Sequence, residues 1–195
     1  YSYMQFIVPG LVMMSVIQNS YGNISSSFFG AKFGRHVEEL LVSPMPNWVI
    51  LGGYVAGAVL RGLISSGIIV LLAFLFGAHI ALTPLFLLVL VLNCIIFAEI
   101  GFLAAMKINT YEEMSQVNTY ILLPMSFLCG TFFATQSLPM VLRYIIELLP
   151  LTHTSYLLRG LGSGSEVALS SVLVLIVYAA AGLLLGSRAF RRLTR

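Results

Sequence analysis

The residues with the strongest chemical demands in this chain are two charges inside long apolar stretches, Arg61 and Glu99. A charge near the centre of a membrane-spanning helix costs about 2.5–3.5 kcal/mol on insertion scales, so it needs a partner, a wet cavity or a route to the interface. Counted with the rise per residue of an α-helix, Arg61 lies ~16–20 Å and Glu99 ~10 Å from the inner ends of their spans, which run antiparallel. Three interpretations stay open: a structural ion pair, separate roles facing a substrate path, and snorkelling.

Motifs for catalysis or metal binding are absent from the sequence. No GxxxxGK[ST] sequence occurs, so the chain lacks a P-loop of its own for ATP. No serine nucleophile elbow or HExxH sequence occurs either, and the three histidines, His36, His79 and His153, are far apart. Cys94 and Cys129 both lie in apolar runs, which favours packing roles over a disulfide. We therefore expect no enzymatic activity, no catalytic residues and no metal site.

The composition excludes most soluble proteins. Of the 195 residues, 59% are apolar and only 9% are charged, and the mean hydropathy is +0.99. A soluble domain carries roughly a quarter charged residues because its surface needs them. An ordinary cytosolic enzyme, a nucleic-acid binder and a disordered chain are therefore excluded. The sequence predicts an all-α polytopic membrane protein that forms a single transmembrane domain over residues 1–195.

Five stretches approach the ~20 apolar residues that a helix needs to cross the hydrocarbon core. They are Met4–Phe29, Trp48–Phe76, Leu85–Met106, Val117–Ala134 and Val167–Ser187. The fourth is short and contains Pro124 and Gly130, so we expect a kink or an incomplete crossing. 

Basic residues in short loops set the orientation of these spans. Four arginines follow the last span, at positions 188, 191, 192 and 195, which predicts a cytoplasmic C-terminus. Counting back places Lys107, Lys32 and Arg35 on the cytoplasmic side as well. Tyr1 then falls outside, so we expect one further span before it and six spans in all.

Residues 32–44 predict an amphipathic cytoplasmic helix. Phe33, Val37, Leu40 and Leu41 share one helical face, and charged residues occupy the other. Such a helix either lies on the lipid headgroups or docks a cytoplasmic partner. Mixed charge favours docking, because a lipid-surface helix is usually rich in Lys and Arg.

Residues 136–164 predict two short helices in series on the outer side. The first starts near Pro139 and ends at Pro150, and the second covers Thr152 to Arg159. Each is too short to span the bilayer. They suggest a hairpin that dips into the outer leaflet, and a solvent-exposed loop with helical turns is the alternative.

Four stretches stand in a recognisable order along the chain. They are residues 3–11 (YMQFIVPGL), residues 35–44 (RHVEELLVSP), Leu138-Pro139 after the apolar run 124–133, and residues 149–153 (LPLTH) with Arg159 and Gly160 downstream. Together they resemble the membrane subunits of ABC-2 type ABC transporters, in the branch of drug and lipo-oligosaccharide exporters.

The resemblance implies a six-helix fold in a bacterial inner membrane, surrounded by lipid. It implies a second permease copy, a homodimer by default, and separate ATPase subunits that bind ATP and Mg. Residues 32–44 correspond to the coupling helix, and its implied docking residues are Arg35, Glu38, Glu39, Leu40 and Leu41. The outer segment corresponds to re-entrant helices, with Pro139, Pro150, Thr152, His153 and Arg159.

We therefore expect an export permease that forms the path for an amphipathic or lipid-linked substrate, with no nucleic-acid partner. Two alternatives remain. A non-transporting membrane scaffold explains the spans but not the amphipathic inner helix or the outer hairpin. An ion-driven secondary transporter would need inverted repeats and several intramembrane carboxylates, and Glu99 is the one clear candidate.

Overall fold

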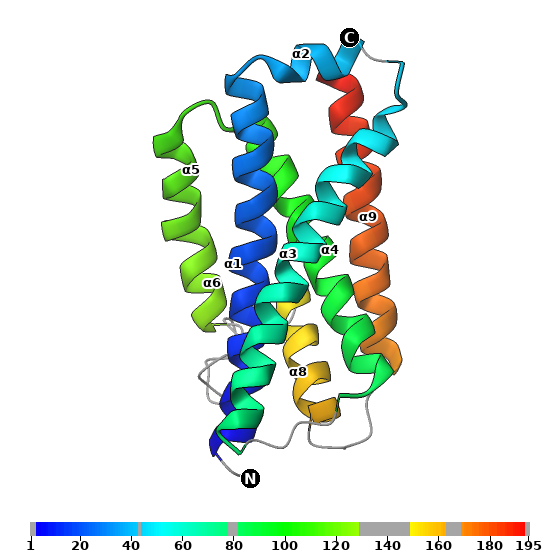
Figure 1. The fold of residues 1–195 in the computed structure, drawn as a ribbon. Coiled ribbons are helices and arrows are strands. Elements are labelled where there is room, and N and C mark those ends of the chain that lie inside the picture. The colour runs from blue at the N-terminus through cyan, green and yellow to red at the C-terminus, as the bar shows by residue number, and fades with distance from the viewer. Residues whose placement is uncertain (1–2, 43, 78–81, 129–148, 163–168, 194–195) are drawn as a thin grey trace, which may run out of the picture.

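The computed structural model describes residues 3–42, 44–77, 82–128, 149–162 and 169–193. Every described element is helical, which confirms the predicted all-α class. In chain order they are α1 (Tyr3–Phe33), α2 (His36–Val42), α3 (Asn47–Leu75), α4 (Pro84–Lys107), α5 (Tyr111–Val117), the π-helical turn η1 (Asn118–Leu122), α6 (Leu123–Leu128), α8 (Pro150–Gly162) and α9 (Leu169–Leu193). The long helices run side by side, with α2 across one end and the short α8 near the other (Figure 1).

Three described helices, α3, α4 and α9, are long and apolar enough to cross a membrane. They confirm the second, third and fifth predicted spans, although α9 continues to Leu193 and so includes Arg188 and Arg191 within the helix. The first predicted span is also helical, because α1 has 31 residues. Its serine, asparagine and glutamine residues lower its hydropathy, and it is not among the three helices that meet both criteria.

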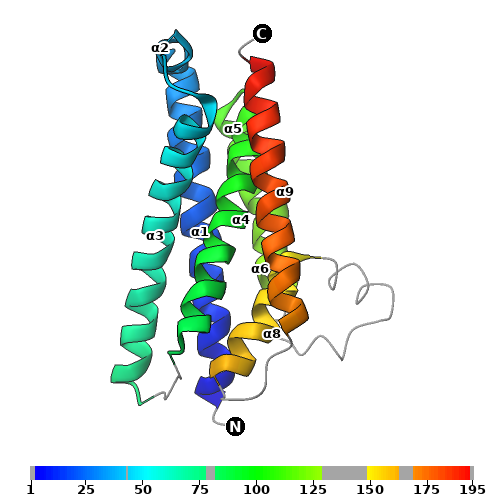
Figure 2. The ribbon, with the colours of Figure 1, turned by 90° about the vertical axis from the view of Figure 1, so that its right-hand side faces the viewer.

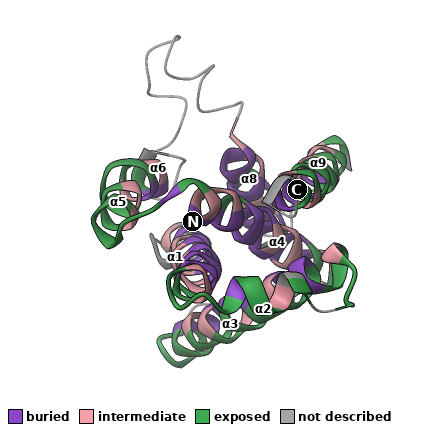
Figure 3. Cartoon of the chain, turned by 90° about the horizontal axis from the view of Figure 1, so that it is seen from above, coloured by how far each residue is buried: buried purple, intermediate pink, exposed green. Residues whose placement is uncertain are grey.

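α4 is the centre of the bundle. Within its most apolar window 61% of residues are buried, against 28% for α3 and 22% for α9. α3 and α9 lie on opposite sides of α4 (Figure 2), and buried residues gather along α4 and the sides that face it (Figure 3). The outer side of α3 is an apolar stripe at helical spacing, formed by Leu60, Ile64, Ile68, Leu71 and Leu75. That stripe suits contact with lipid chains.

The fourth predicted span takes a different form. A continuous helical run begins at Tyr111 and passes through α5, η1 and α6 to Leu128, and positions 129–148 lie outside the described residues. Pro124 has no amide hydrogen, and in an α-helix its ring would clash with the carbonyl of Tyr120. The π-helical turn just before Pro124 widens the backbone at this point, and the Leu123 amide donates to the carbonyl of Asn118. The backbone is therefore irregular just before Pro124, as a π turn, while the expected kink or incomplete crossing stays a prediction.

α2 begins later than the sequence predicts. Lys32 and Phe33 belong to the end of α1, and the chain turns at Gly34 and Arg35 before α2 starts at His36. Arg35 has a positive φ of 58°, which an L-residue adopts only at a cost of about 1–2 kcal/mol. The prediction of one helix over residues 32–44 is therefore wrong at its start, because the backbone breaks where a left-handed residue is required.

Gly101 lets α1 and α4 approach each other closely. A Cβ atom at this position would lie 2.6 Å from Ile24 Cγ2 and 2.9 Å from the carbonyl oxygen of Tyr21. The second contact is with backbone, which cannot rotate away. The packing of these two helices therefore depends on the absence of a side chain at Gly101.

Replacing Gly101 with alanine tests this packing. We expect Gly101→Ala to lower the free energy of unfolding by about 1–3 kcal/mol, because α1 must move away from α4. Thermal unfolding in mild detergent measures the change. The matched control is Gly67→Ala on α3, where a Cβ atom meets nothing within 4 Å. An equal or smaller loss in Gly101→Ala than in the control would contradict the close approach.

Candidate functional site

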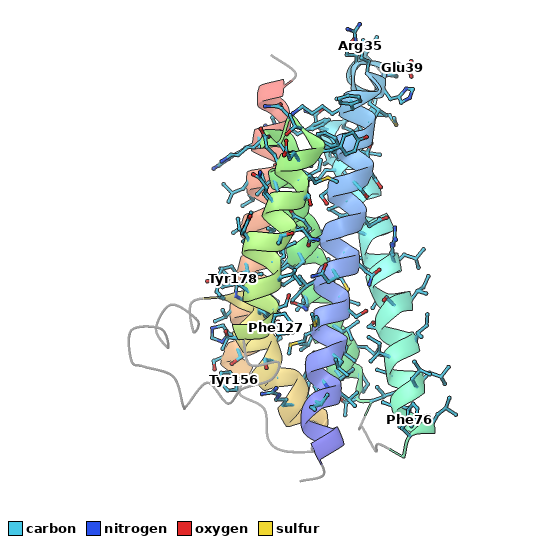
Figure 4. All side chains as sticks on the ribbon, turned by 90° about the vertical axis from the view of Figure 1, so that its left-hand side faces the viewer. Arg35, Glu39, Phe76, Phe127, Tyr156 and Tyr178 are labelled. Carbon is cyan, nitrogen blue, oxygen red and sulfur yellow. The ribbon has the colours of Figure 1, made fainter. Side chains whose placement is uncertain are left out.

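One side of α1 is polar although α1 belongs to a bundle of apolar helices. Ser15, Gln18, Asn19, Gly22, Asn23 and Ser26 recur at helical spacing, and none of these six is fully buried. Residues of this side bond to Ser65 of α3 and line a cavity with α5, and Figure 4 shows α1 between α3 and the α5–α6 segment. Unsatisfied polar groups facing hydrocarbon cost several kcal/mol each. The polar side of α1 therefore suits contact with water or with another protein surface better than contact with lipid.

A ladder of hydrogen bonds joins this side of α1 to α3. The hydroxyl groups of Ser15 and Ser65 are 2.6 Å apart, and Asn19 Nδ2 donates to Ser65 Oγ at 2.8 Å. One to two turns further along, Arg61 Nη1 donates to Asn23 Oδ1 at 3.2 Å. The Arg61 side chain is exposed on this face, so its charge reaches the medium that the polar side of α1 contacts.

The structure separates Arg61 from Glu99, so the possible ion pair is not formed. Glu99 lies on α4, is 2% exposed, and neither of its carboxylate oxygens has a hydrogen-bond partner. Its carboxylate points at Gly182 of α9, where an added Cβ atom would overlap Oε2. Estimating depth along the helices placed the two charges near each other, but Arg61 faces α1 and Glu99 faces α9.

A cavity of about 280 Å³ lies between α1 and α5. Its lining residues are Gln18, Tyr21, Gly22, Ser25, Tyr111, Met114, Ser115 and Asn118. Gln18 Nε2 and the Tyr21 hydroxyl are buried and have no hydrogen-bond partner. Leaving a buried donor unpaired costs about 1–3 kcal/mol, so these groups are suited to bind water or a polar group that enters the cavity.

Sequence reasoning missed this cavity. The helical spacing of Ser15, Asn19 and Asn23 in the first predicted span was a usable signal for the polar side of α1. Nothing in the sequence shows that α5 lies beside α1, because no residue between Tyr111 and the fourth predicted span indicates which helix this segment packs against.

Aromatic rings and Lys32 hold α1 and α5 together at the α2 end of the cavity. The Tyr111 ring lies 4.7 Å from that of Phe29 and 5.7 Å from that of Phe33, measured between centroids. Lys32 Nζ donates to the carbonyls of Met106 and Ile108 at 3.1 and 2.9 Å, and to Asn109 Oδ1 at 2.9 Å. The end of α1 is thus tied to the turn between α4 and α5.

The start of α5 is itself well capped. The Thr110 hydroxyl accepts from the Glu113 amide at 3.2 Å, and the Glu113 carboxylate accepts from the Asn109 amide at 2.9 Å. These bonds keep the turn that Lys32 contacts in a defined shape.

α2 presents the predicted docking residues at the end of the bundle. Glu38 and Glu39 are exposed, and Arg35 and Glu39 point away from the bundle in Figure 4. Val37 is buried and Leu40 is half-buried against the core, while the Leu41 side chain lies outside what is described. Phe33, expected on this apolar face, instead ends α1 and is 67% exposed. His36 Nδ1 lies 3.8 Å from Glu39 Oε2.

α8 confirms the second of the two short helices predicted on the outer side. It begins at Pro150 and ends at Gly162, and it packs against α1, α4 and α9. Thr152 is buried, whereas His153 and Arg159 are half-buried. Thr154 Oγ1 donates to Asn93 Oδ1 of α4 at 3.3 Å, so α8 is bonded into the bundle. The first short helix, with Pro139, lies outside the described residues.

Comparison with known proteins identifies the family. The model of the family described as "ABC-2 type transporter" matches residues 1–162. The chain belongs to the ABC-2 type transporter family. With its apolar helices, this makes it a membrane-embedded subunit of a transporter.

Named relatives agree with this assignment. The chain is 40% identical over 184 residues to the inner membrane transport permease YadH of Escherichia coli K12, a match that covers 92% of this chain and 72% of the relative. It is 26% identical over 195 residues to nodulation protein J of Rhizobium leguminosarum bv. viciae, covering 98% and 75%. No solved structure matches the chain.

A double-mutant cycle tests the contact between Glu99 and Gly182. We expect Gly182→Ala to destabilise the protein because the added methyl group overlaps the Glu99 carboxylate, and we expect Glu99→Ala to relieve that overlap. The coupling energy from thermal unfolding should exceed about 1 kcal/mol. The parallel cycle of Arg61→Ala with Glu99→Ala should give a coupling near zero. A larger coupling energy for Arg61 with Glu99 than for Gly182 with Glu99 would contradict the placement of Arg61 against α1 and of Glu99 against α9.

Loss of the Lys32 amine should loosen α1 from the turn before α5. Lys32→Met keeps most of the apolar stem and removes all three hydrogen bonds, so we expect the free energy of unfolding to fall by about 1–3 kcal/mol. Lys107→Met is the matched control, since Lys107 is exposed at the nearby end of α4. Chemical denaturation in detergent measures the free energy of unfolding of both variants. Equal values would contradict the attachment of α1 to this turn through Lys32.

Proposed function

We propose that the chain is the permease subunit of an ATP-binding cassette exporter in a bacterial inner membrane. The observation that carries the proposal is the polar side of α1, with Arg61 exposed on it and the cavity between α1 and α5 beside it. In a bundle whose outer α3 stripe is apolar, such a side suits a wet path through the membrane. The membership of the ABC-2 family and the permease relatives support the same function.

A second copy of the chain completes the path. One bundle leaves Ser26 and the charged Arg61 exposed beside the polar side of α1, and two copies facing each other across a twofold axis would enclose them. A homodimer needs no further gene product, which makes it the simplest arrangement. Lipid then covers the apolar stripe on the outer side of α3.

Energy comes from a partner, because the chain has no P-loop. ATP and Mg bind to a separate ATPase subunit, which docks on α2 and the turn before it, through Arg35, Glu38, Glu39, Leu40 and Leu41. The chain itself has no enzymatic role. ATP can drive transport only if it binds the two conformations of the complex with different affinity.

The contacts at the α2 end offer a route for this coupling. Motion of α2 displaces the end of α1, and Lys32 with the three rings displaces the start of α5 in turn. α1 and α5 are the two walls of the cavity, so its width changes with the position of α2. At the opposite end, α8 is the re-entrant element near the exit.

The substrate class follows from the lining of the cavity. Tyr21, Tyr111 and Met114 offer apolar surface, whereas Gln18, Ser115 and Asn118 offer hydrogen bonds. A molecule with an apolar and a polar part satisfies both, such as an amphipathic drug or a lipid-linked sugar.

A pull-down tests the proposal directly. We expect the full-length protein, isolated in mild detergent from its native membrane, to bring down a stoichiometric ATPase with a Walker A motif, identified by mass spectrometry. Glu38→Lys should reduce recovery at least fivefold, because it reverses an exposed charge on α2. The matched control, Glu112→Lys, reverses an exposed charge at the start of α5 and should leave recovery unchanged.

Two outcomes would refute parts of this proposal. Recovery of no ATPase with intact, well-expressed protein would favour a scaffold or an ion-driven carrier. Equal losses in Glu38→Lys and Glu112→Lys would leave the ATPase in place but remove α2 as its docking element.

A further inference from the structure

Arg61 carries a positive charge at the middle of a membrane-spanning helix. α3 runs from Asn47 to Leu75, so Arg61 is its central residue and lies about 21 Å from each end. In a hydrocarbon core about 30 Å thick, the middle of a span lies about 15 Å from either boundary, further than an arginine side chain extends. Snorkelling to a headgroup, which the sequence left open, is therefore disfavoured.

The charge of Arg61 is not neutralised within this copy of the chain. Arg61 Nη1 donates to Asn23 Oδ1 at 3.2 Å, and that acceptor is a neutral amide. No acidic side chain of the described residues pairs with Arg61. A guanidinium has several N–H donors, so most of those of Arg61 remain available for a ligand.

A second copy of the chain brings no described carboxylate to this depth. The chain has seven acidic residues, all of them glutamates, and five are described. Four of these lie at the α2 end of the bundle (Figure 1), namely Glu38, Glu39, Glu112 and Glu113. The fifth, Glu99, is buried against Gly182 of α9. Because a twofold axis along the membrane normal keeps each residue at its depth, the described glutamates of a second copy cannot pair with Arg61 either.

The surroundings of Arg61 are polar on one side and apolar on the other. Toward α1 lie Asn23 and, one turn further along α3, Ser65, which both take part in hydrogen bonds between the two helices. On the other side Ile64 is 57% exposed and belongs to the apolar stripe of α3. Gly57, one turn before Arg61, has no side chain to fill the space beside it. A molecule with a polar and an apolar part fits this border.

The charge and the depth together favour a phosphate group. Guanidinium binds carboxylate and phosphate oxygens in a bidentate manner. A carboxylate far from water can take up a proton and lose its charge, whereas a phosphate ester keeps a negative charge at neutral pH. A cationic group would be repelled by Arg61, most strongly where the dielectric constant is low.

We propose that Arg61 binds the phosphate group of an amphiphilic substrate at the middle of the membrane. The inference rests on the proposed function, because it needs the polar side of α1 to face a path. Asn23 holds the guanidinium in place, and the apolar part of the substrate lies along the stripe on α3. Among amphipathic substrates, this site selects anionic molecules over cationic drugs.

Binding of two probe lipids to the full-length protein tests the site. Oleoyl lysophosphatidic acid and monoolein have the same acyl chain, and only the first has a phosphate group. We expect lysophosphatidic acid to bind about tenfold more tightly, measured by native mass spectrometry in detergent. Arg61→Gln should abolish this preference. The matched control, Arg188→Gln, removes the same charge from an exposed position near the end of α9 and should keep it.

Asn23→Asp gives a second test, in which Arg61 stays in place. The new carboxylate would occupy the position of the amide that accepts from Arg61, and it would neutralise the guanidinium. We therefore expect Asn23→Asp to lose the preference for lysophosphatidic acid. Asn23→Ala removes the hydrogen bond without adding a charge, so it should still prefer lysophosphatidic acid. Thermal unfolding without probe lipid shows whether each variant is folded.

Four results would overturn the proposal. Equal binding of both probe lipids to the wild-type protein would remove recognition of phosphate. Equal losses in Arg61→Gln and Arg188→Gln would show diffuse surface charge instead of a site. An unchanged preference in Asn23→Asp would place the lipid away from Arg61. Displacement of lysophosphatidic acid by millimolar inorganic phosphate would identify a site for a soluble anion.

The outcome is separable from that of the proposed function. Recovery of an ATPase without any lipid preference would keep the permease and refute the phosphate site. Recovery of no ATPase, with a preference that depends on Arg61, would support the phosphate site and refute the ATP-driven permease.

Discussion

The cost of leaving polar backbone or side-chain groups in hydrocarbon governs this structure. It makes every described element a helix, and it determines which sides of those helices can face lipid. The stripe from Leu60 to Leu75 on α3 meets that requirement, whereas the polar side of α1 does not. The polar side of α1 is therefore the surface that says most about function, because it is the one least suited to lipid. Hydrogen bonds to α3 satisfy Ser15, Asn19 and Asn23 within the bundle, whereas Gln18 and the charge of Arg61 call for water or a second protein surface.

Two kinds of contact hold the helices of the bundle together. Close packing around α4, including the approach at Gly101, makes a rigid unit of α1, α3, α4 and α9. The α5–α6 segment is joined to that unit at two places. Near α2 it is held by Lys32 and the rings of Phe29 and Tyr111, and further along Leu122 is buried in the core. The cavity lies beside Tyr111–Asn118, between these two attachments.

Hydropathy and helix-stop residues were enough to predict much of the fold. α3, α4 and α9 follow from apolar runs of sufficient length, and α8 follows from Pro150 and the glycines after Arg159. The break at Arg35 escaped prediction because it depends on a left-handed backbone conformation at a residue that rarely adopts one. Helical rise gives the depth of Arg61 and Glu99 but not the direction each faces, so an ion pair remained possible from the sequence. The cavity between α1 and α5 needs two distant segments side by side, and no local pattern encodes that.

The π-helical turn η1 also bears on how such a chain can change over generations. A π turn is one helical turn that holds an extra residue, and it absorbs that residue within the turn. In a regular α-helix, one inserted residue would rotate everything beyond it by about 100°. Deleting a single codon within Asn118–Leu122 would therefore restore regular winding and leave the α6 side chains on the sides that they occupy now. This segment can gain or lose one residue at this place without a new packing arrangement for the helix beyond it.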